Sequence, residues 1–515
     1  MTATTPTGTI EAAFNRWIDP IVNVSDFIWG GTWNGEEVLP FPPMVLILLG
    51  IGLYMMAGLK FYPIRKLGSA FTGLFRKSES ASAGEISPFA ALSTALSGQV
   101  GTGNLAGVAT ALALGGPGAI FWMWITALIG MALAFGEGAL AVRFRETTPE
   151  GHVRGGPMAY IVLGLGPKWK WLAALFCIGT LFSALVTGNG IQANSFADSV
   201  QELTGLEEWV GGLIAAVAVF VVIIGGIKSI GNVAEKVVPT MAATYILMAF
   251  IALILNLQDI PETFSRIFYG AFNAQSASGG FLGAALIIAI RAGVARGLFS
   301  NEAGQGSTPI AHAVAQNPDP AAQGRLAMLG TFIDTIVICT MTALVILTVE
   351  GDFTHTDAAT GASVAVKHAW QSDLAGFSMT SGAFAAAFPF QVAGIPIGTL
   401  VASVALLLFV FTTLLTWSYY GERAITFLYD MVPGANRKGE LVLHMIWRVL
   451  WCVVIFIGSF APLGFVWRLG DISNAAMALP NLLALVALSG VIFALSRGEK
   501  VRGKGEVEGA GVPAE

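Results

Sequence analysis

Long apolar runs, separated by short polar segments, make up most of the chain. A helix that spans a bilayer needs about 20 predominantly apolar residues, and eleven runs meet or nearly meet that length. The runs lie at residues 43–61, 88–114, 117–142, 171–197, 209–227, 237–257, 280–303, 327–349, 395–421, 442–462 and 474–496. This pattern predicts an all-α membrane protein with eleven transmembrane helices.

The composition agrees with this prediction. Of the 515 residues, 55% are apolar and 11% charged, and the mean hydropathy is +0.72. Soluble domains carry about 25% charged residues, so the composition excludes an ordinary soluble protein. A net charge of −5 offers no basic surface for nucleic acid, and three cysteines inside apolar runs cannot form a disulfide framework. The first run lacks the basic segment and cleavage site of a signal peptide.

Lysine and arginine fall mostly in alternate loops. With the N-terminus outside, twenty of these side chains lie in inner loops and four in outer ones, which is the asymmetry that marks cytoplasmic loops. We therefore expect an extracytoplasmic N-terminal arm, residues 1–42, and a disordered cytoplasmic tail, residues 497–515. The long outer loop, 350–394, contains an apolar stretch, so we expect it to pack back on the protein as a lid or hairpin, or to form a peripheral cap.

Two of the apolar runs contain helix-breaking residues at their centres. Glycine costs about 1 kcal/mol relative to alanine inside a helix, yet Gly98–Asn104 holds three glycines among polar residues. The run at 280–303 and the residues just after it have the same texture, with Gly293, Arg296, Gly297 and the segment 300–306. Close helix packing is the alternative explanation for small residues in membrane helices.

These interrupted runs occupy corresponding positions in two halves of the chain. If run 43–61 is an extra N-terminal helix, they become helices 1 and 6 of ten, within repeats at 88–257 and 280–496. Such a pattern indicates a transporter built from two five-helix inverted repeats. Free amides at a broken helix attract a carboxylate and free carbonyls attract a cation, so the breaks suit a zwitterionic amino acid and a small metal ion.

Several segments together resemble the alanine/glycine:cation symporter family of bacteria and archaea. They are ALSTALSGQVGTGNLAGVATALALGGPGAIFWMW (91–124), GGPMAYI (155–161), GNGIQANS (188–195), GVARGLFSNEAGQGSTPIAHA (293–313), FIDTIVICTMTALVIL (332–347) and TTLLTWSYYGER (412–423). The resemblance covers about 40–490 and implies uptake of alanine or glycine, coupled to sodium or sometimes to protons, across the bacterial inner membrane. It also implies the ten-helix leucine-transporter fold with discontinuous helices 1 and 6, no enzymatic activity and no cofactor besides the coupling ion.

The resemblance implies a sodium site between the first and eighth helices of that fold. The matching ligands are the carbonyls near Ser97 and Val100, the carbonyl of Phe409, and the hydroxyls of Thr412 and Thr413. Neutral oxygens suffice for sodium. The alternative for the threonine pair is hydrogen bonding to the preceding helical turn.

Substrate contacts follow from the breaks and from one further helix. The carboxylate is expected at the amides around Gly101, Thr102, Gly103 and Asn104, and the ammonium group near Gly293. Asn189 and Gln192 are three residues apart, so they would share a helix face and close the pocket; bonds between helices are the alternative. Trp417 would limit side-chain size, or else anchor the helix at the interface.

Ionisable residues inside the runs are candidates for gating or ion pairing. Arg296 and Glu302 are expected to pair or gate the cytoplasmic side, with Asp334 as a partner of Arg291 or Arg296, although a purely structural pair is equally consistent. Glu302, Asp334 or Glu137 could instead carry a coupling proton. An intramembrane enzyme lacks a metal-ligand motif such as HExxH, and a channel would need filter repeats that the chain does not show.

Overall fold

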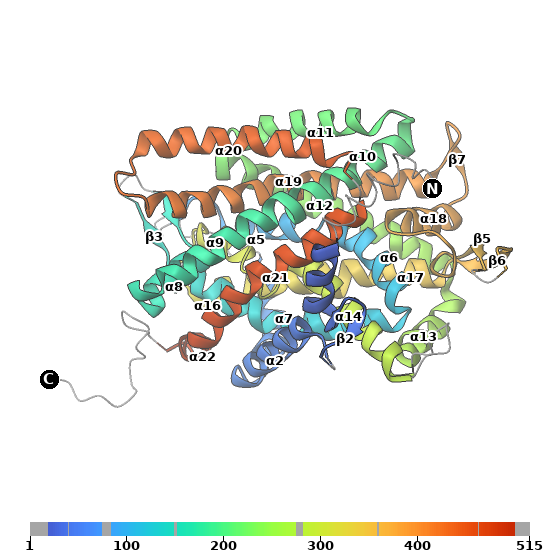
Figure 1. Ribbon diagram of the computed structural model, residues 1–515, viewed down its shortest axis with the longest axis horizontal. Coiled ribbons are helices and arrows are strands. Elements are labelled where there is room, and N and C mark those ends of the chain that lie inside the picture. The colour runs from blue at the N-terminus through green and yellow to red at the C-terminus, as the bar shows by residue number, and fades with distance from the viewer. Residues whose placement is uncertain are drawn as a thin grey trace, which may run out of the picture.

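The computed structural model describes residues 19–39, 41–74, 84–148, 152–273, 282–357, 360–461 and 463–499. Most of these residues are helical, and the helices lie in layers across the molecule (Figure 1). The first 18 residues of the predicted N-terminal arm and nearly all of the predicted tail lie outside the described residues.

Within the described ranges, seven helices are long and apolar enough to cross a membrane. They are α7 (Gly118–Arg143), Pro167–Thr204, α12 (Gly226–Leu255), Pro320–Thr348, α19 (Ile397–Asp430), α20 (Arg437–Gly458) and Val466–Ala487 within α21 (Leu463–Ala487). Four of the eleven predicted runs fall short of this standard. Of these, α2 (Pro43–Gly58) and α11 (Glu208–Ile223) have 16 residues each, and the runs at 88–114 and 280–303 are the two interrupted ones.

Residues 19–30 are also helical, and shorter elements complete the described chain. The remaining helices are α3 (Tyr62–Arg65), α4 (Leu67–Gly73), α5 (Pro88–Gln99), η1 (Gly103–Gly107), α6 (Val108–Gly115), α8 (Pro157–Leu165), η2 (Pro167–Trp169), α9 (Lys170–Leu185), η3 (Val186–Gly190), α10 (Ile191–Thr204), η4 (Leu257–Asp259), α13 (Ile260–Phe272), α14 (Leu282–Asn301), α15 (Thr308–Ala313), α16 (Pro320–Thr331), η5 (Phe332–Cys339), α17 (Thr340–Thr348), η6 (Ala369–Gln371), α18 (Phe377–Ala387) and α22 (Ser489–Ser496). Four antiparallel hairpins pair β1 (Thr32–Trp33) with β2 (Glu36–Glu37), β3 (Glu146–Thr147) with β4 (Val153–Arg154), β5 (Glu350–Thr356) with β6 (Ser363–His368), and β7 (Gln391–Val392) with β8 (Ile395–Pro396).

Two helices begin well before the runs that predicted them. Helix α12 starts at Gly226 rather than 237, and α21 starts at Leu463 rather than 474. The early turns contain polar residues such as Lys228 and Asp471, which lower the local hydropathy without ending the helix. Apolar content therefore located the apolar part of each helix and missed its more polar N-terminal turns.

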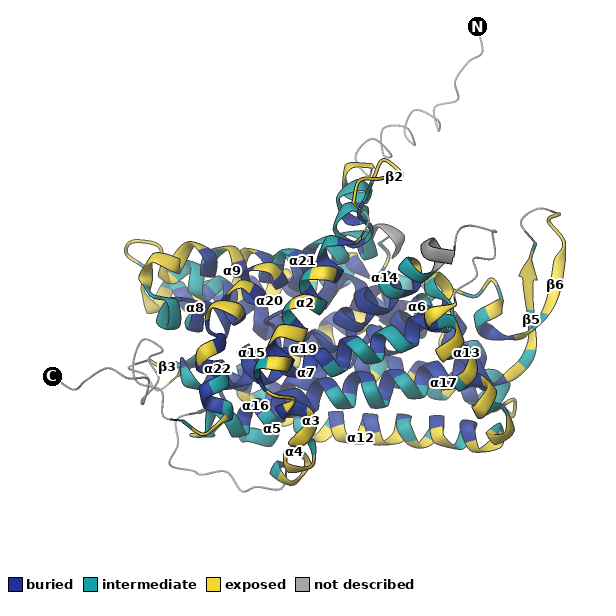
Figure 2. Cartoon of the chain, turned by 90° about the horizontal axis from the view of Figure 1, so that it is seen from below, coloured by how far each residue is buried: buried dark blue, intermediate teal, exposed yellow. Residues whose placement is uncertain are grey.

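The long segment 350–394 folds back on the bundle. Its hairpin, β5–β6, is largely exposed at one edge of the molecule (Figure 2), whereas α18 buries most of its apolar side chains. Thr380 of α18 donates a hydrogen bond to the carbonyl of Leu105 at 3.0 Å. This contact ties the segment to η1, which lies within the first interrupted run.

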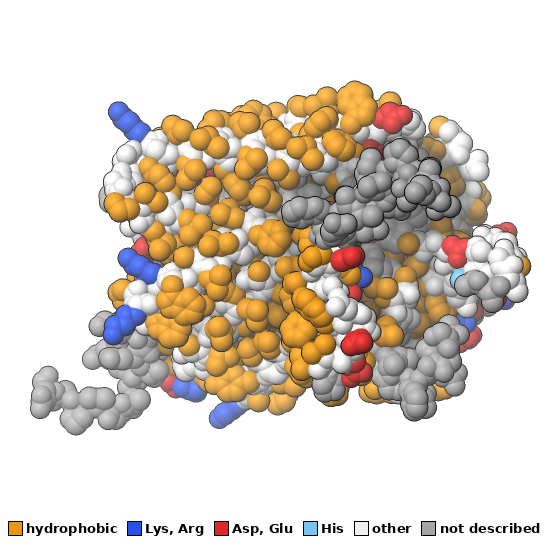
Figure 3. Space-filling model, in the orientation of Figure 1, with side chains coloured by type: hydrophobic (Ala, Val, Ile, Leu, Met, Phe, Trp, Pro, Cys, Tyr) orange, Lys and Arg blue, Asp and Glu red, His pale blue; other side chains and the backbone are white. Residues whose placement is uncertain are grey.

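The outer surface of the bundle is apolar. On α20, Leu441, Met445 and Val449 are among the exposed hydrophobic side chains, while α7 is almost entirely buried (Figure 2). Hydrophobic side chains cover most of the face in Figure 3, and lysine and arginine gather at the end that carries the α19–α20 turn. A broad apolar surface flanked by polar ends is typical of a protein whose sides contact lipid.

Candidate functional site

The first interruption leaves backbone carbonyls at the end of α5 without their helical donors. Helix α5 ends at Gln99, and Val100 is extended, with ψ of 98°. The amide of Gly101 would bond the Ser97 carbonyl in a continuous α-helix, but it donates to Asn104 Oδ1 at 2.8 Å. The break predicted from Gly98–Asn104 therefore frees oxygen atoms at the centre of the bundle.

The second interruption separates α14 from α15. Glu302, Gly304 and Gly306 all have positive φ, of 56°, 85° and 88°. A positive φ is unfavourable for a residue with a side chain, so Glu302 holds a strained position at the turn. The polar and glycine-rich texture after residue 300 reflects this turn.

The two interruptions touch each other. Gln99 Nε2 donates to the carbonyl of Asn301 at 2.6 Å. Asp334 of η5 joins both breaks, because it accepts from Asn104 Nδ2 at 2.6 Å and from Ser300 Oγ at 2.8 Å. Asp334 is fully buried and pairs with neither Arg291 nor Arg296, so that predicted pairing is wrong.

A cluster of four neutral oxygens lies between the first break and α19. Thr413 Oγ1 lies 3.1 Å from the carbonyl oxygen of Val100 and 2.9 Å from that of Phe409. Thr412 Oγ1 lies 3.0 Å from the same Phe409 oxygen. We call these four atoms the oxygen cluster. Several hard, neutral oxygens fit a sodium ion, and the freed carbonyl of Ser97 belongs to the same broken segment.

The two threonines are not equivalent. Both hydroxyls bond back to the preceding turn of α19, as the alternative for this pair proposed, Thr413 to Phe409 and Thr412 to Leu408 and Phe409. Only Thr413 also bridges α19 to the break, at Val100, whereas Thr412 lies 3.7 Å from Met241 Sδ. Sequence reasoning missed Thr416, whose hydroxyl lies 2.5 Å from that of Ser97. The spacing from Thr413 to Thr416 is three residues, which places both on one helix face and could have identified it.

Gln192 lies at the amides where a substrate carboxylate was expected. Its Oε1 accepts hydrogen bonds from the Thr102 amide at 3.1 Å and from the Thr102 hydroxyl at 2.9 Å. Gly101 is wedged between two partners, because a Cβ there would lie 2.6 Å from Thr413 Oγ1 and 2.9 Å from Gln192 Oε1. Gly103 packs in the same way against Phe299 and Ser300 of the second break.

Asn189 does not face the site, contrary to the expectation that it shares a face with Gln192. Its Nδ2 donates to the carbonyl of Trp451 on α20 at 2.9 Å. The cause is η3, a π-helical segment that ends at Gly190 between the two residues. A π turn holds more residues than an α turn, so the i, i+3 rule does not apply here.

Trp417 joins the second break to α19. Its Nε1 donates to Glu302 Oε1 at 2.9 Å, and its ring packs against Gly188. Trp417 is 1% exposed, so it is not an interface anchor. The other oxygen of Glu302 accepts from the hydroxyl of Ser307.

The predicted pair of Arg296 with Glu302 is also wrong. Arg296 Nη2 bonds both carboxylate oxygens of Asp471 on α21, at 2.7 and 2.9 Å, and Arg291 pairs with Asp26. Glu302 lies past the end of α14, at the turn with positive φ, where its carboxylate accepts from Trp417 and Ser307 and not from Arg296.

Gly293 packs against α7 instead of facing the breaks. A Cβ at Gly293 would lie 2.4 Å from the carbonyl oxygen of Ala119 and 2.6 Å from Trp122 Cβ. We expect Gly293→Ala to lower the unfolding temperature in detergent, because overpacking costs about 1–3 kcal/mol. Gly297→Ala is the matched control, since its nearest contacts lie at 3.3 Å. Equal unfolding temperatures for the two variants would contradict this packing role.

A lipid-solvated helical bundle with two interrupted helices meeting at its centre is the architecture of a secondary transporter. The sequence model of the sodium:alanine symporter family matches residues 32–505, and the chain belongs to that family.

Named relatives extend this result. The chain is 39% identical over 497 residues to the sodium/alanine symporter AgcS of Methanococcus maripaludis, covering 96% of this chain and 100% of that protein. It is 37% identical to a putative sodium/proton-dependent alanine carrier of Bacillus subtilis, YrbD, over 88% of this chain and 89% of that one. The crystal structure of MhsT in complex with L-phenylalanine has a TM-score of 0.50 and 15% identity, with 80% of this chain and 89% of that chain covered, and shares the leucine-transporter type of fold.

Proposed function

We propose that this protein is a secondary active transporter that couples the uptake of alanine, glycine or both to sodium by alternating access. The observation that carries the proposal is the oxygen cluster of Val100, Phe409, Thr412 and Thr413, which lies beside Gly101 at the first break. The name of the relative AgcS, a sodium/alanine symporter, supports both the ion and the substrate class. Ser97 would complete the set of sodium ligands through its freed carbonyl.

The proposed substrate site lies against the same break. The carboxylate would bind the amides of Thr102, Gly103 and Asn104, displacing Gln192 Oε1 from the Thr102 amide. Trp417, which its hydrogen bond to Glu302 holds in place, would form one wall of the site. The close packing around Gly101 and Gly103 leaves no room there for a large substrate side chain, which supports a small substrate.

The proposed architecture has eleven spans: an extra helix followed by inverted repeats at 88–257 and 280–496. The N-terminus would lie outside and the protein would reside in the bacterial inner membrane. Support comes from the matching positions of the two breaks and from the basic side chains at the α19–α20 end of the bundle.

In this orientation Arg296 would gate the outer side of the site rather than the cytoplasmic side. Its guanidinium lies 4.7 Å from the ring centre of Trp467 and 5.8 Å from that of Phe299, and it pairs with Asp471. Phe299 in turn packs on Gly103. The Arg296–Asp471 pair thus covers the two breaks from one side.

Proton coupling is the second candidate function. Glu137, Glu302 and Asp334 are fully or almost fully buried, and none of them forms an ion pair with a described lysine, arginine or histidine. A buried, unpaired carboxylate is costly unless it binds a proton or a cation. The relative YrbD, a putative sodium/proton-dependent carrier, agrees with such a role.

Uptake into proteoliposomes separates these functions. We expect saturable uptake of labelled alanine or glycine that requires an inward sodium gradient at fixed membrane potential. Uptake that follows a proton gradient and ignores sodium would favour the second candidate. The absence of saturable alanine and glycine uptake under either gradient would overturn both.

A further inference from the structure

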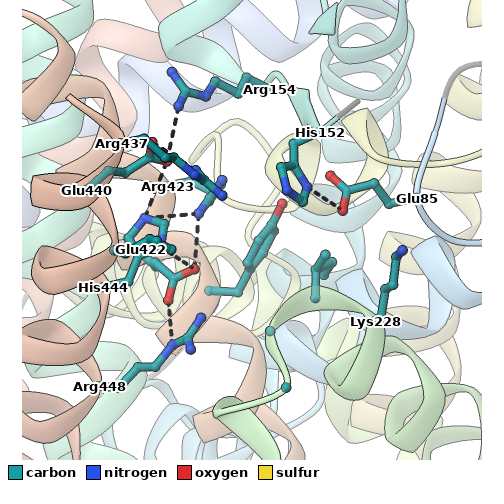
Figure 4. A pocket seen from close by; sticks show the side chains of 15 residues that line it. Glu85, His152, Arg154, Lys228, Glu422, Arg423, Arg437, Glu440, His444 and Arg448 are labelled. Atoms are coloured by element: carbon teal, nitrogen blue, oxygen red, sulfur yellow. Dashed lines mark hydrogen bonds and ion pairs between the residues drawn. The ribbon is translucent and has the colours of Figure 1, made fainter. Parts of the chain in front are cut away.

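A polar cavity lies at the α19–α20 end of the bundle, away from the two breaks. Its volume is about 240 Å³, and it is lined by the α11–α12 turn, the C-terminal half of α19, the first turns of α20 and the β3–β4 region. We call it the basic cavity. Figure 4 shows its charged side chains, with Lys228 across the cavity from the cluster formed by α19 and α20.

Positive charge exceeds negative charge around this cavity. The lining cations are Arg154, Lys228, Arg423, Arg437 and Arg448, and the lining carboxylates are Glu85, Glu422 and Glu440. Asp430, which pairs with Arg154 from outside the lining, still leaves the cations in excess. An anion is therefore the class of ligand that this cavity favours.

Glu422 and Glu440 are occupied by arginines and Glu85 accepts from the Val153 amide at 2.9 Å, whereas some donors have no partner among the described residues. Glu422 accepts from Arg423 and from Arg448 Nε at 2.8 Å, and Glu440 accepts from Arg154 and Arg437. Arg423 Nε is buried and has no hydrogen-bond partner among the described residues. Lys228 likewise forms no ion pair within the described part of the chain.

The N-terminus of α12 faces the same cavity. Gly225, Gly226 and Ile227 line it, and the first turn of α12 has neither a capping side chain nor an acidic residue. Arg448 fixes this turn by donating to the carbonyl of Ile224 at 3.0 Å. Free amides and the positive end of the helix dipole add to the positive side chains.

From this convergence we propose that the basic cavity binds a phosphate group, held by the α12 amides, Lys228, Arg423 and Arg448. Phosphate offers several acceptor oxygens to donors that come from three elements, which suits charge-assisted hydrogen bonds. The group comes either from free phosphate or from the headgroup of an anionic lipid, since the cavity lies at one end of the spanning helices. Its binding bridges α12 to α19 and α20.

The test measures the unfolding temperature of the full-length protein, in detergent for the phosphate titration and in nanodiscs for the lipid comparison, without substrate and at constant sodium concentration and ionic strength. Inorganic phosphate is titrated against chloride, and bilayer nanodiscs of phosphatidylglycerol are compared with nanodiscs of phosphatidylcholine. We expect phosphate to raise the unfolding temperature saturably, Lys228→Gln to weaken that effect roughly three- to tenfold, and Lys228→Glu to abolish it. Lys236→Gln, also exposed on α12 but outside the basic cavity, is the matched control.

Each outcome decides the proposal. A phosphate effect that depends on Lys228 supports a free-phosphate ligand, and stabilisation only by phosphatidylglycerol that Lys228→Glu removes supports a lipid headgroup. No stabilisation by either ligand, or equal behaviour of the Lys228 and Lys236 variants, overturns it. Because uptake is not measured, this result is independent of the proposed transport function.

Discussion

Gly101→Ala should reduce alanine uptake roughly 10- to 100-fold while leaving a folded protein. The added methyl would lie 2.6 Å from Thr413 Oγ1 and 2.9 Å from Gln192 Oε1, so it would push apart the oxygen cluster and the amide at Thr102. Overpacking of a rigid site costs about 1–3 kcal/mol, and at this position that cost falls on the proposed ion and substrate contacts. Initial uptake rates in proteoliposomes under an inward sodium gradient provide the measurement.

Gly107→Ala is the control for this experiment. Gly107 belongs to the same interrupted helix, but the nearest atom to its added methyl would be Thr102 O at 3.9 Å. We expect near-normal uptake from this variant. If Gly101→Ala transports as well as Gly107→Ala, the first break is not the substrate and ion site.

Thr413→Ala should raise the sodium concentration that gives half-maximal uptake roughly 10- to 100-fold, with a smaller effect on the preference among amino acids. The hydroxyl of Thr413 contacts two carbonyls of the oxygen cluster, those of Val100 and Phe409. Thr412→Ala should act in the same direction but less, because the Thr412 hydroxyl contacts only one of those carbonyls. The measurement is alanine uptake as a function of external sodium.

Thr413→Ser keeps the hydroxyl and is the conservative control. It should restore sodium dependence to within about threefold of the original protein. If the variants change the amino-acid preference but not the sodium requirement, Thr413 contacts the substrate and not the ion. Equal sodium curves for Thr413→Ala and Thr413→Ser would remove it from the ion site.

The helix breaks were predictable because their cause is local. Gly98–Asn104 and the segment after Ser300 both combine glycine with polar residues inside or beside apolar runs. The first loses helical hydrogen bonds, and the second adopts positive φ at Glu302, Gly304 and Gly306. Gln192, which was expected from its helix to contact the substrate, lies at the first break, where its Oε1 accepts from the Thr102 amide.

The pairing of charged side chains was not predictable from the sequence. Arg296 finds its partner 175 residues away, at Asp471, and Asp334 takes hydrogen bonds from both breaks instead of an arginine. These choices depend on how the helices turn relative to one another. The run-by-run hydropathy that located the helices has no information about that rotation.

Asn189 shows the same limit at shorter range. Its three-residue spacing from Gln192 indicated a shared face, but the π-helical turn of η3 directs it to α20. Hydropathy also placed the start of α12 eleven residues late, at 237 instead of Gly226, and thereby hid the helix end that lines the basic cavity.

Three π-helical segments surround the breaks: η1 begins at Gly103, η3 precedes Gln192, and η5 contains Asp334. A π turn stores a surplus residue relative to an α turn. Passing that residue along the helix rotates the following side chains by about 100° without lengthening any loop. Each helix that meets at the breaks therefore has one extra residue whose position can shift along the helix. Such a shift would rotate different side chains toward the breaks while the helical backbone stays hydrogen-bonded.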